Sequence, residues 1–174
     1  MKIRIGKFAL ALCLVCLTSV VLAGCGGIFN KQDKPLRVEV AFTAGDSLNF
    51  DGKSIQSVQL KAYVLKDMQR FNAADVRAFF DAEFDPGFLA QFAKDTLGSV
   101  TVIVAPGEAA TGIIEVPHLF AKREPNLYIG VIANFNRPPS DRAQQRFAYK
   151  IQKEWKQTIK VSVNKNVVSR AKKK

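Results

Sequence analysis

The chain has 174 residues and a formal net charge of +11. This length suits one hydrophobic core. A single histidine speaks against a catalytic triad or a catalytic zinc site, which usually need more. There is also no glycine-rich phosphate loop. We therefore expect no catalytic residues, metal or cofactor.

The N-terminus has the pattern of a secretory signal. Basic residues in the first seven positions precede an apolar run from Phe8 to Ala23, and no further charge follows until Lys31. Roughly 16 apolar residues match a signal-peptide core, whereas a membrane-spanning helix needs roughly 20. Cys13 and Cys16 lie inside this run, so their C-x-x-C spacing would leave with the signal.

The end of the apolar run, Leu22-Ala23-Gly24-Cys25, resembles the lipobox of bacterial lipoproteins. The resemblance implies that residues 1–24 are removed and that Cys25 is lipidated; the alternative is an ordinary signal peptide with an incidental cysteine. Gly26, where an aspartate would mark inner-membrane retention, implies sorting to the outer membrane. Nucleic acid is then a poor partner. Residues 25–35 would form a flexible tether that reaches some 35 Å at most.

The first elements of the mature chain read as strands. Residues 36–44 and 57–67 alternate apolar and polar side chains, which is typical of half-buried strands. Residues 45–53 between them have turn composition, yet include Leu48 and Phe50. These two side chains either fold back onto the core or face a partner.

Helical spacing follows the second strand. Asn72 is the expected N-cap of a helix that carries Val76, Phe79, Phe80 and Phe84. A Pro-Gly pair then precedes a short second helix. The phenylalanines are interpreted chiefly as core residues, and the alternative is a ligand cradle.

Further strands complete the chain. Residues 99–108, 110–120 and 125–135 read as strands, with Pro117 marking an edge or a strand end in the second and with the third in a central position. A loop and a final stretch of strand follow. Six or seven short strands with one helical insert predict a β-sandwich occupying residues 36–174. The basic C-terminal tail could contact anionic lipid, but a solvated tail is favoured.

Two further groups of residues could suggest a catalytic or metal site, but each is better interpreted as part of the protein surface. His118 follows a proline near a strand end and is interpreted as a surface or boundary residue. The acidic residues between Asp75 and Asp85 lack the spacing of an EF-hand loop, so a solvated helix face is the better interpretation.

An ordered set of motifs resembles the TssJ lipoproteins of type VI secretion. None is specific alone, but together they cover nearly all of the mature chain. They are the lipobox, Leu48 to Gly52, Val58 to Asp67, Phe71 to Phe80, Leu97 to Glu108, Tyr128 to Phe135, and Trp155.

This resemblance implies a mainly β, transthyretin-like sandwich with a short helical insertion between the second and third strands. It also implies a non-enzymatic lipoprotein, anchored in the outer membrane and facing the periplasm. Such a protein binds the periplasmic part of the inner-membrane protein TssM and so tethers the secretion membrane complex. The family's contact loop follows the first strand, which here gives Asp46, Ser47, Leu48, Asn49, Phe50 and Asp51 as expected partner-binding residues.

The alternative function is that of a periplasmic ligand-binding lipoprotein. It would use the phenylalanine-rich helices as a pocket wall, and it predicts a sizeable apolar cavity under Phe80, Phe84 and Phe88. A filled core at that place would count against it.

Overall fold

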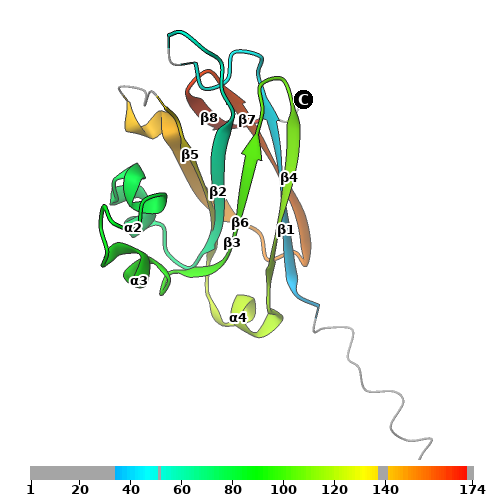
Figure 1. Cartoon of the computed structure of the whole chain (residues 1–174). Coiled ribbons are helices and arrows are strands. Elements are labelled where there is room, and N and C mark those ends of the chain that lie inside the picture. Colours follow the sequence, from blue (N-terminus) through cyan, green and yellow to red (C-terminus); the bar gives the residue numbers. More distant parts are fainter. Residues whose placement is uncertain (1–33, 51, 137–140, 172–174) are drawn as a thin grey trace, which may run out of the picture. The chain divides into compact units, whose positions relative to one another are not determined.

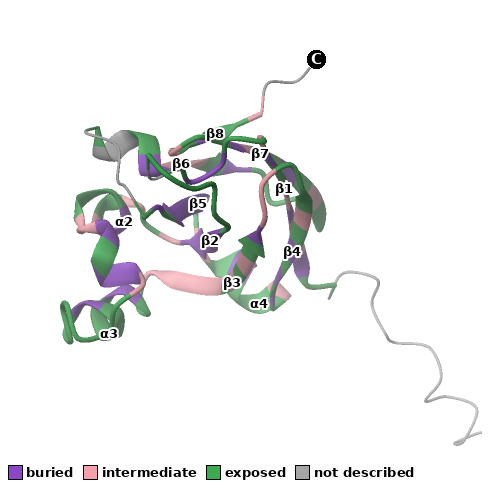
Figure 2. Cartoon of the chain, turned by 45° about the horizontal axis from the view of Figure 1, so that its top comes forward, coloured by how far each residue is buried: buried purple, intermediate pink, exposed green. Residues whose placement is uncertain are grey.

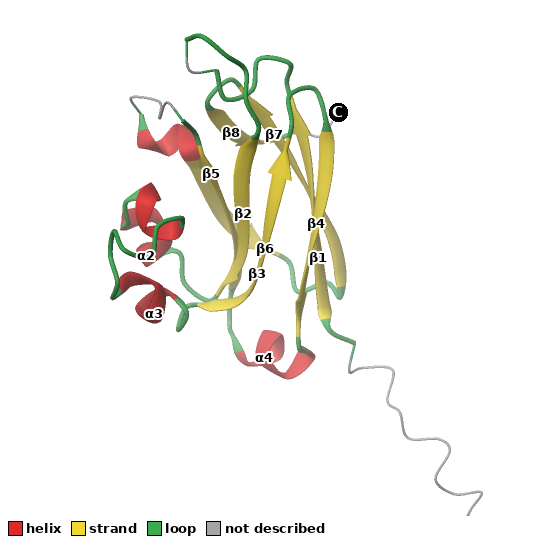
Figure 3. Cartoon of the chain, viewed as in Figure 1, coloured by secondary structure: helices red, strands yellow, loops and turns green. Residues whose placement is uncertain are grey.

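Two four-stranded sheets pack face to face in the part of the chain that the structure describes (Figure 1, Figure 3). The computed structural model describes residues 34–50, 52–136 and 141–171, without the side chains of residues 142 and 143. The strands are β1 (Leu36–Ala44), β2 (Val58–Leu65), β3 (Thr96–Val104), β4 (Ala109–Val116), β5 (Leu127–Asn134), β6 (Arg146–Ile151), β7 (Lys156–Asn164) and β8 (Val167–Arg170).

The first sheet has the order β4-β1-β7-β8. β1 pairs with β4 in antiparallel and with β7 in parallel orientation. Its side chains alternate as predicted: Val38, Val40 and Phe42 are buried between the sheets. Pro117 directly follows β4, which lies at the edge of the sheet, as its strand-breaking chemistry predicts.

The second sheet has the order β3-β2-β5-β6, so β5 is an inner strand, as its continuous apolar run predicts. β2 departs from simple alternation, because Tyr63 and Leu65 are buried although they point away from the sandwich core. A helical insert covers them. Its segments are α2 (Gln69–Ala73), the 3-10 helix η1 (Val76–Phe79) and α3 (Phe88–Phe92).

Aromatic rings fill the space between this insert and the sheet. The Phe79 ring centroid lies 5.4 Å from that of Phe71, 4.8 Å from that of Phe88 and 5.1 Å from that of Phe92. Phe71 packs so closely on β5 that a Cβ atom at Gly130 would lie 2.9 Å from its Cζ. The interpretation of these rings as core is confirmed. Phe84 is the exception: it is exposed, with the Arg77 guanidinium 4.0 Å from its ring centroid.

The predicted N-cap of the insert is wrong. Asn72 lies inside α2, and the chain becomes extended at Ala74. Asp75 caps the next segment instead, because its carboxylate accepts a hydrogen bond of 2.9 Å from the backbone N–H of Arg77. The buried Arg146 of β6 closes the end of α2 by donating to the carbonyl oxygens of Phe71 and Ala74 at 2.6 and 2.7 Å.

Three elements were not predicted. The helix α4 (His118–Arg123) follows Pro117, where the strand was expected to continue to residue 120. The 3-10 helix η2 (Arg142–Gln145) lies in the expected loop before β6. β8 adds an eighth strand by folding back on β7 through the turn at Lys165 and Asn166.

Candidate partner-binding loop

The loop after β1 lies at one end of the sandwich. Because Thr43 pairs with Ala109 and Ala44 with Val163, the end of β1 lies beside the start of β4 and the end of β7. The loop spans residues 45–57, of which Asp51 is outside the described residues. Figure 2 turns this end toward the viewer.

The base of the loop is fixed by its neighbours. The Gly45 N–H donates to the Val163 carbonyl at 2.8 Å, and the Gly107 N–H donates to the Gly45 carbonyl at 3.3 Å. A Cβ atom at position 45 would lie only 2.6 Å from Oδ1 of Asn164, so a larger residue there would have to displace the Asn164 side chain.

The expectation that Leu48 faces a partner is wrong in this structure. Its side chain is 0% exposed and belongs to the main core with Leu60 and Val163. The chain turns inward because the Leu48 N–H donates to the Gly45 carbonyl at 3.2 Å. Leu48 therefore holds the loop on the sandwich, which is the alternative that the sequence left open.

Asn49 is buried as well, and its polar atoms join three segments. Its Nδ2 donates to the Ser57 carbonyl at 2.8 Å, and its Oδ1 accepts from the Asn136 N–H at 2.8 Å. Its backbone N–H donates to the Lys165 carbonyl at 2.8 Å. Its φ of 50° lies in the left-handed region, which asparagine tolerates better than most residues. The Asn49 side chain positions the loop and is not accessible to a partner.

The outer part of the loop presents apolar side chains to solvent. Phe50 is 45% exposed, and Ile55, which the sequence analysis did not single out, is 50% exposed. Val167 at the start of β8 is also exposed, and the neighbouring Asn166 donates from Nδ2 to the Phe50 carbonyl at 3.4 Å. Asp46 and Ser47, nearer the base of the loop, are exposed as well. Of the expected contact residues, Asp46, Ser47 and Phe50 are accessible.

The expected lipidation site, Cys25, lies outside the described residues. Within the described part of the chain, no helix is long and apolar enough to cross a membrane. The same residues contain no group of His, Cys, Asp and Glu that could hold a metal ion.

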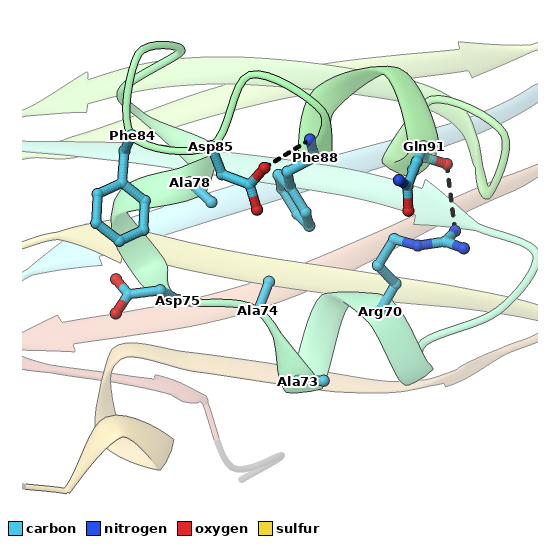
Figure 4. Close-up of a pocket in the computed structure, with 9 residues that line it drawn as sticks. All are labelled: Arg70, Ala73, Ala74, Asp75, Ala78, Phe84, Asp85, Phe88 and Gln91. Carbon is cyan, nitrogen blue, oxygen red and sulfur yellow. Dashed lines mark hydrogen bonds between the residues drawn. The ribbon is translucent and has the colours of Figure 1, made fainter.

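The alternative function, that of a ligand-binding lipoprotein, predicts a sizeable apolar cavity under the phenylalanine rings. The described residues do not form one. The rings under the helical insert are packed against one another, as described above. A cleft of about 270 Å³ lies beside them. Phe84 and Phe88 line it, but so do charged and amide groups of Arg70, Asp75, Asp85 and Gln91 (Figure 4). The Arg70 guanidinium there donates to the Gln91 carbonyl at 3.2 Å and is paired with Asp95. The filled core counts against a Phe-rich binding pocket.

The fold and the loop define a class of protein: a two-sheet β-sandwich with a helical cover and a braced loop at one end. The family of type VI secretion lipoproteins that includes VasD, EvfM and TssJ matches residues 36–166, and the chain belongs to this family. Members of this family are structural lipoproteins of secretion systems, and the family is not a known class of enzyme. A search of curated protein sequences finds no match.

Solved structures share the fold at low sequence identity. The lipoprotein TssJ1 from Pseudomonas aeruginosa is 18% identical with a TM-score of 0.60, over 78% of this chain and 94% of its own. Serratia marcescens Lip, a membrane-bound component of the type VI system, is 16% identical with a TM-score of 0.60, over 78% and 97%. A chain in a structure described as the TssM C-terminal domain from EAEC is 19% identical with a TM-score of 0.61, over 78% and 98%. The predicted fold class and family are confirmed.

Proposed function

We propose that this lipoprotein is anchored in the outer membrane through lipidated Cys25 and binds the periplasmic part of a TssM-like inner-membrane protein. It thereby tethers the membrane complex of a type VI secretion system to the outer membrane. The exposed part of the 45–57 loop, with Phe50 and Ile55, is the contact surface in this proposal. Leu48 and Asn49 hold that surface in position.

The observation that carries the proposal is the contrast within this loop. Its base is fixed by backbone hydrogen bonds and by buried Leu48 and Asn49, yet Phe50 and Ile55 remain exposed. A braced loop with exposed apolar side chains loses little conformational entropy on binding, which favours affinity. Membership of a family of type VI secretion lipoproteins supports a partner within that system.

The test is capture of the partner from native membranes by the full-length, tagged lipoprotein. The wild type is expected to enrich a large inner-membrane protein with a periplasmic domain. Phe50→Asp combined with Ile55→Asp should weaken that capture by about 2 kcal/mol or more, roughly 30-fold, because charged groups would replace two apolar contacts.

Ile103→Asp is the matched control, because Ile103 is an aliphatic side chain on β3, outside the loop, and at 68% it is more exposed than Ile55. It should leave capture unchanged. Equal capture by the wild type and the loop variant would remove the loop from the contact. Absence of any enriched inner-membrane protein would overturn the proposed partner.

A further inference from the structure

Three connecting segments lie together at the end of the sandwich opposite the 45–57 loop. Leu36 pairs with Val116, Arg37 with Lys156, and Leu127 with Ile151. The start of the described chain, the α4 segment after β4 and the turn between β6 and β7 therefore share this end (Figure 1). A backbone hydrogen bond of 2.8 Å from the Arg37 N–H to the Trp155 carbonyl joins two of them.

Large apolar side chains are exposed at this end. Leu119 and Phe120 of α4 are 65% and 52% exposed, while the next residue, Ala121, is buried and holds the helix on the core. Trp155, in the turn between β6 and β7, is 57% exposed. Neither α4 nor this turn belongs to the proposed partner-binding loop, so the proposed function leaves these three side chains unexplained.

Basic side chains surround them. Lys34 lies with its Nζ 5.0 Å from the centroid of the Trp155 ring, and Lys153 donates from Nζ to the Glu124 carbonyl. The exposed basic residues of the three segments are Lys34, Lys122, Arg123, Lys153 and Lys156. Their acidic residues are Glu124 and Glu154, and Arg37 forms an ion pair with Glu115.

We propose that this end, defined by Leu119, Phe120 and Trp155 with their basic neighbours, rests on the surface of an anionic phospholipid bilayer. This inference rests on the proposed lipidation of Cys25. Lys34 is nine residues beyond Cys25 in the chain. Even fully extended, nine residues span roughly 30 Å, so this is the end of the sandwich that the anchor holds nearest to the bilayer.

The chemistry of the end fits a bilayer surface. Tryptophan prefers the boundary between headgroups and acyl chains, and leucine and phenylalanine insert below it. Each lysine or arginine near an anionic surface adds about 1 kcal/mol of attraction. The contact orients the sandwich as well as holding it, because the 45–57 loop then points away from the bilayer toward the periplasm.

Trp155 is the only tryptophan of the chain, so its fluorescence reports on this end alone. The lipidated full-length protein is reconstituted into vesicles of phosphatidylethanolamine and phosphatidylglycerol that contain phospholipids brominated along the acyl chain. The wild type should show bromine quenching of Trp155 and reduced quenching by aqueous acrylamide. Leu119→Asp with Phe120→Asp should abolish both effects, provided that the melting temperature remains close to that of the wild type.

Lys122→Glu with Arg123→Glu gives a second variant that leaves the apolar residues in place. It should weaken bromine quenching, and high salt should weaken it in the wild type, because the Debye length falls from about 10 Å at 0.1 M to about 3 Å at 1 M. Phe50→Asp with Ile55→Asp is the control at the opposite end and should leave quenching unchanged while partner capture is weakened.

Absence of bromine quenching in a wild-type protein that remains attached to the vesicles would overturn the inference. Protection of Trp155 only after a partner protein is added, or only at high concentrations of the lipoprotein without vesicles, would overturn it too, in favour of a protein contact. Mass spectrometry of the N-terminal peptide scores the lipidation of Cys25 separately. A missing lipid would therefore contradict the proposed anchor without being mistaken for the absence of contact.

Discussion

Leu48, Asn49 and Phe50 follow one another in the chain and lie in three different environments. Leu48 is in the hydrophobic core, Asn49 makes buried hydrogen bonds, and Phe50 is exposed. Composition identifies the segment as a turn and shows that two apolar side chains in it need an explanation. It cannot separate them, because only the tertiary packing decides which side chain points inward. An asparagine in a turn is a weak signal for a left-handed residue, and here it marked the position that braces the loop.

Leu48→Ala should lower the free energy of unfolding by about 2–5 kcal/mol, because it removes a fully buried side chain and leaves a cavity. Phe50→Ala is the control two residues away, and we expect less than about 1 kcal/mol, since its side chain is half in solvent. Urea unfolding of both variants measures the difference. Similar losses for the two variants would contradict the different placement of these side chains.

Tyr63 gives the molecule a sensitivity to alkaline pH. Burial raises the pKa of its hydroxyl above the ordinary value of 10.0, because the phenolate would lose its hydration. Above about pH 10 the unfolded chain loses this proton while the folded chain keeps it. The stabilising contribution is therefore complete below about pH 10 and is lost as the pH rises beyond that value.

Tyr63→Phe should consequently make the fall in unfolding free energy at alkaline pH less steep than in the wild type. Urea unfolding on both sides of about pH 10 measures the slopes. Some slope should remain, because burial also raises the pKa of Tyr149, although Arg170 opposes that shift. Identical slopes in the two proteins would show that the Tyr63 hydroxyl is not shielded from water.

At the scale of elements, the strands with clear alternation could be predicted from the sequence. β1, β2 and β5 appear close to their expected residues because a half-buried or buried strand imposes a pattern on its side chains. α4 and β8 could not be recognised, since six and four residues are too few to show a period. α4 forms immediately after Pro117, where the pattern of β4 is broken.

The helical insert is held on the second sheet by contact between Phe71 and Gly130. Gly130→Ala should cost about 1–3 kcal/mol of unfolding free energy, because the new Cβ would lie 2.9 Å from Phe71 Cζ and 3.1 Å from Leu65 Cδ1. Gly87→Ala is the matched control. A Cβ there has only Asp85 Oδ1 at 3.8 Å, and we expect a change below about 1 kcal/mol. Equal effects in thermal unfolding would contradict the close packing of the insert.

At the scale of the whole molecule, the two ends of the sandwich differ in chemistry. One end holds the braced loop with Phe50 and Ile55, and the other carries Leu119, Phe120 and Trp155 among basic side chains. The sequence supported a sandwich, but not the parallel pairing of β1 with β7, which joins residues more than a hundred positions apart. That pairing brings Lys34 beside Trp155 and so creates the second end.

The central claim is that one molecule joins a membrane and a partner protein at the same time. The most direct measurement is recruitment of the purified periplasmic domain of the captured partner to vesicles that carry the lipidated protein, read by flotation. We predict recruitment by the wild type, strongly reduced recruitment by Phe50→Asp with Ile55→Asp, and none by Cys25→Ser, which stays unlipidated in solution with the partner bound. Recruitment that survives the loop substitutions, or a Cys25→Ser protein that floats with the vesicles as well as the wild type, would contradict this account.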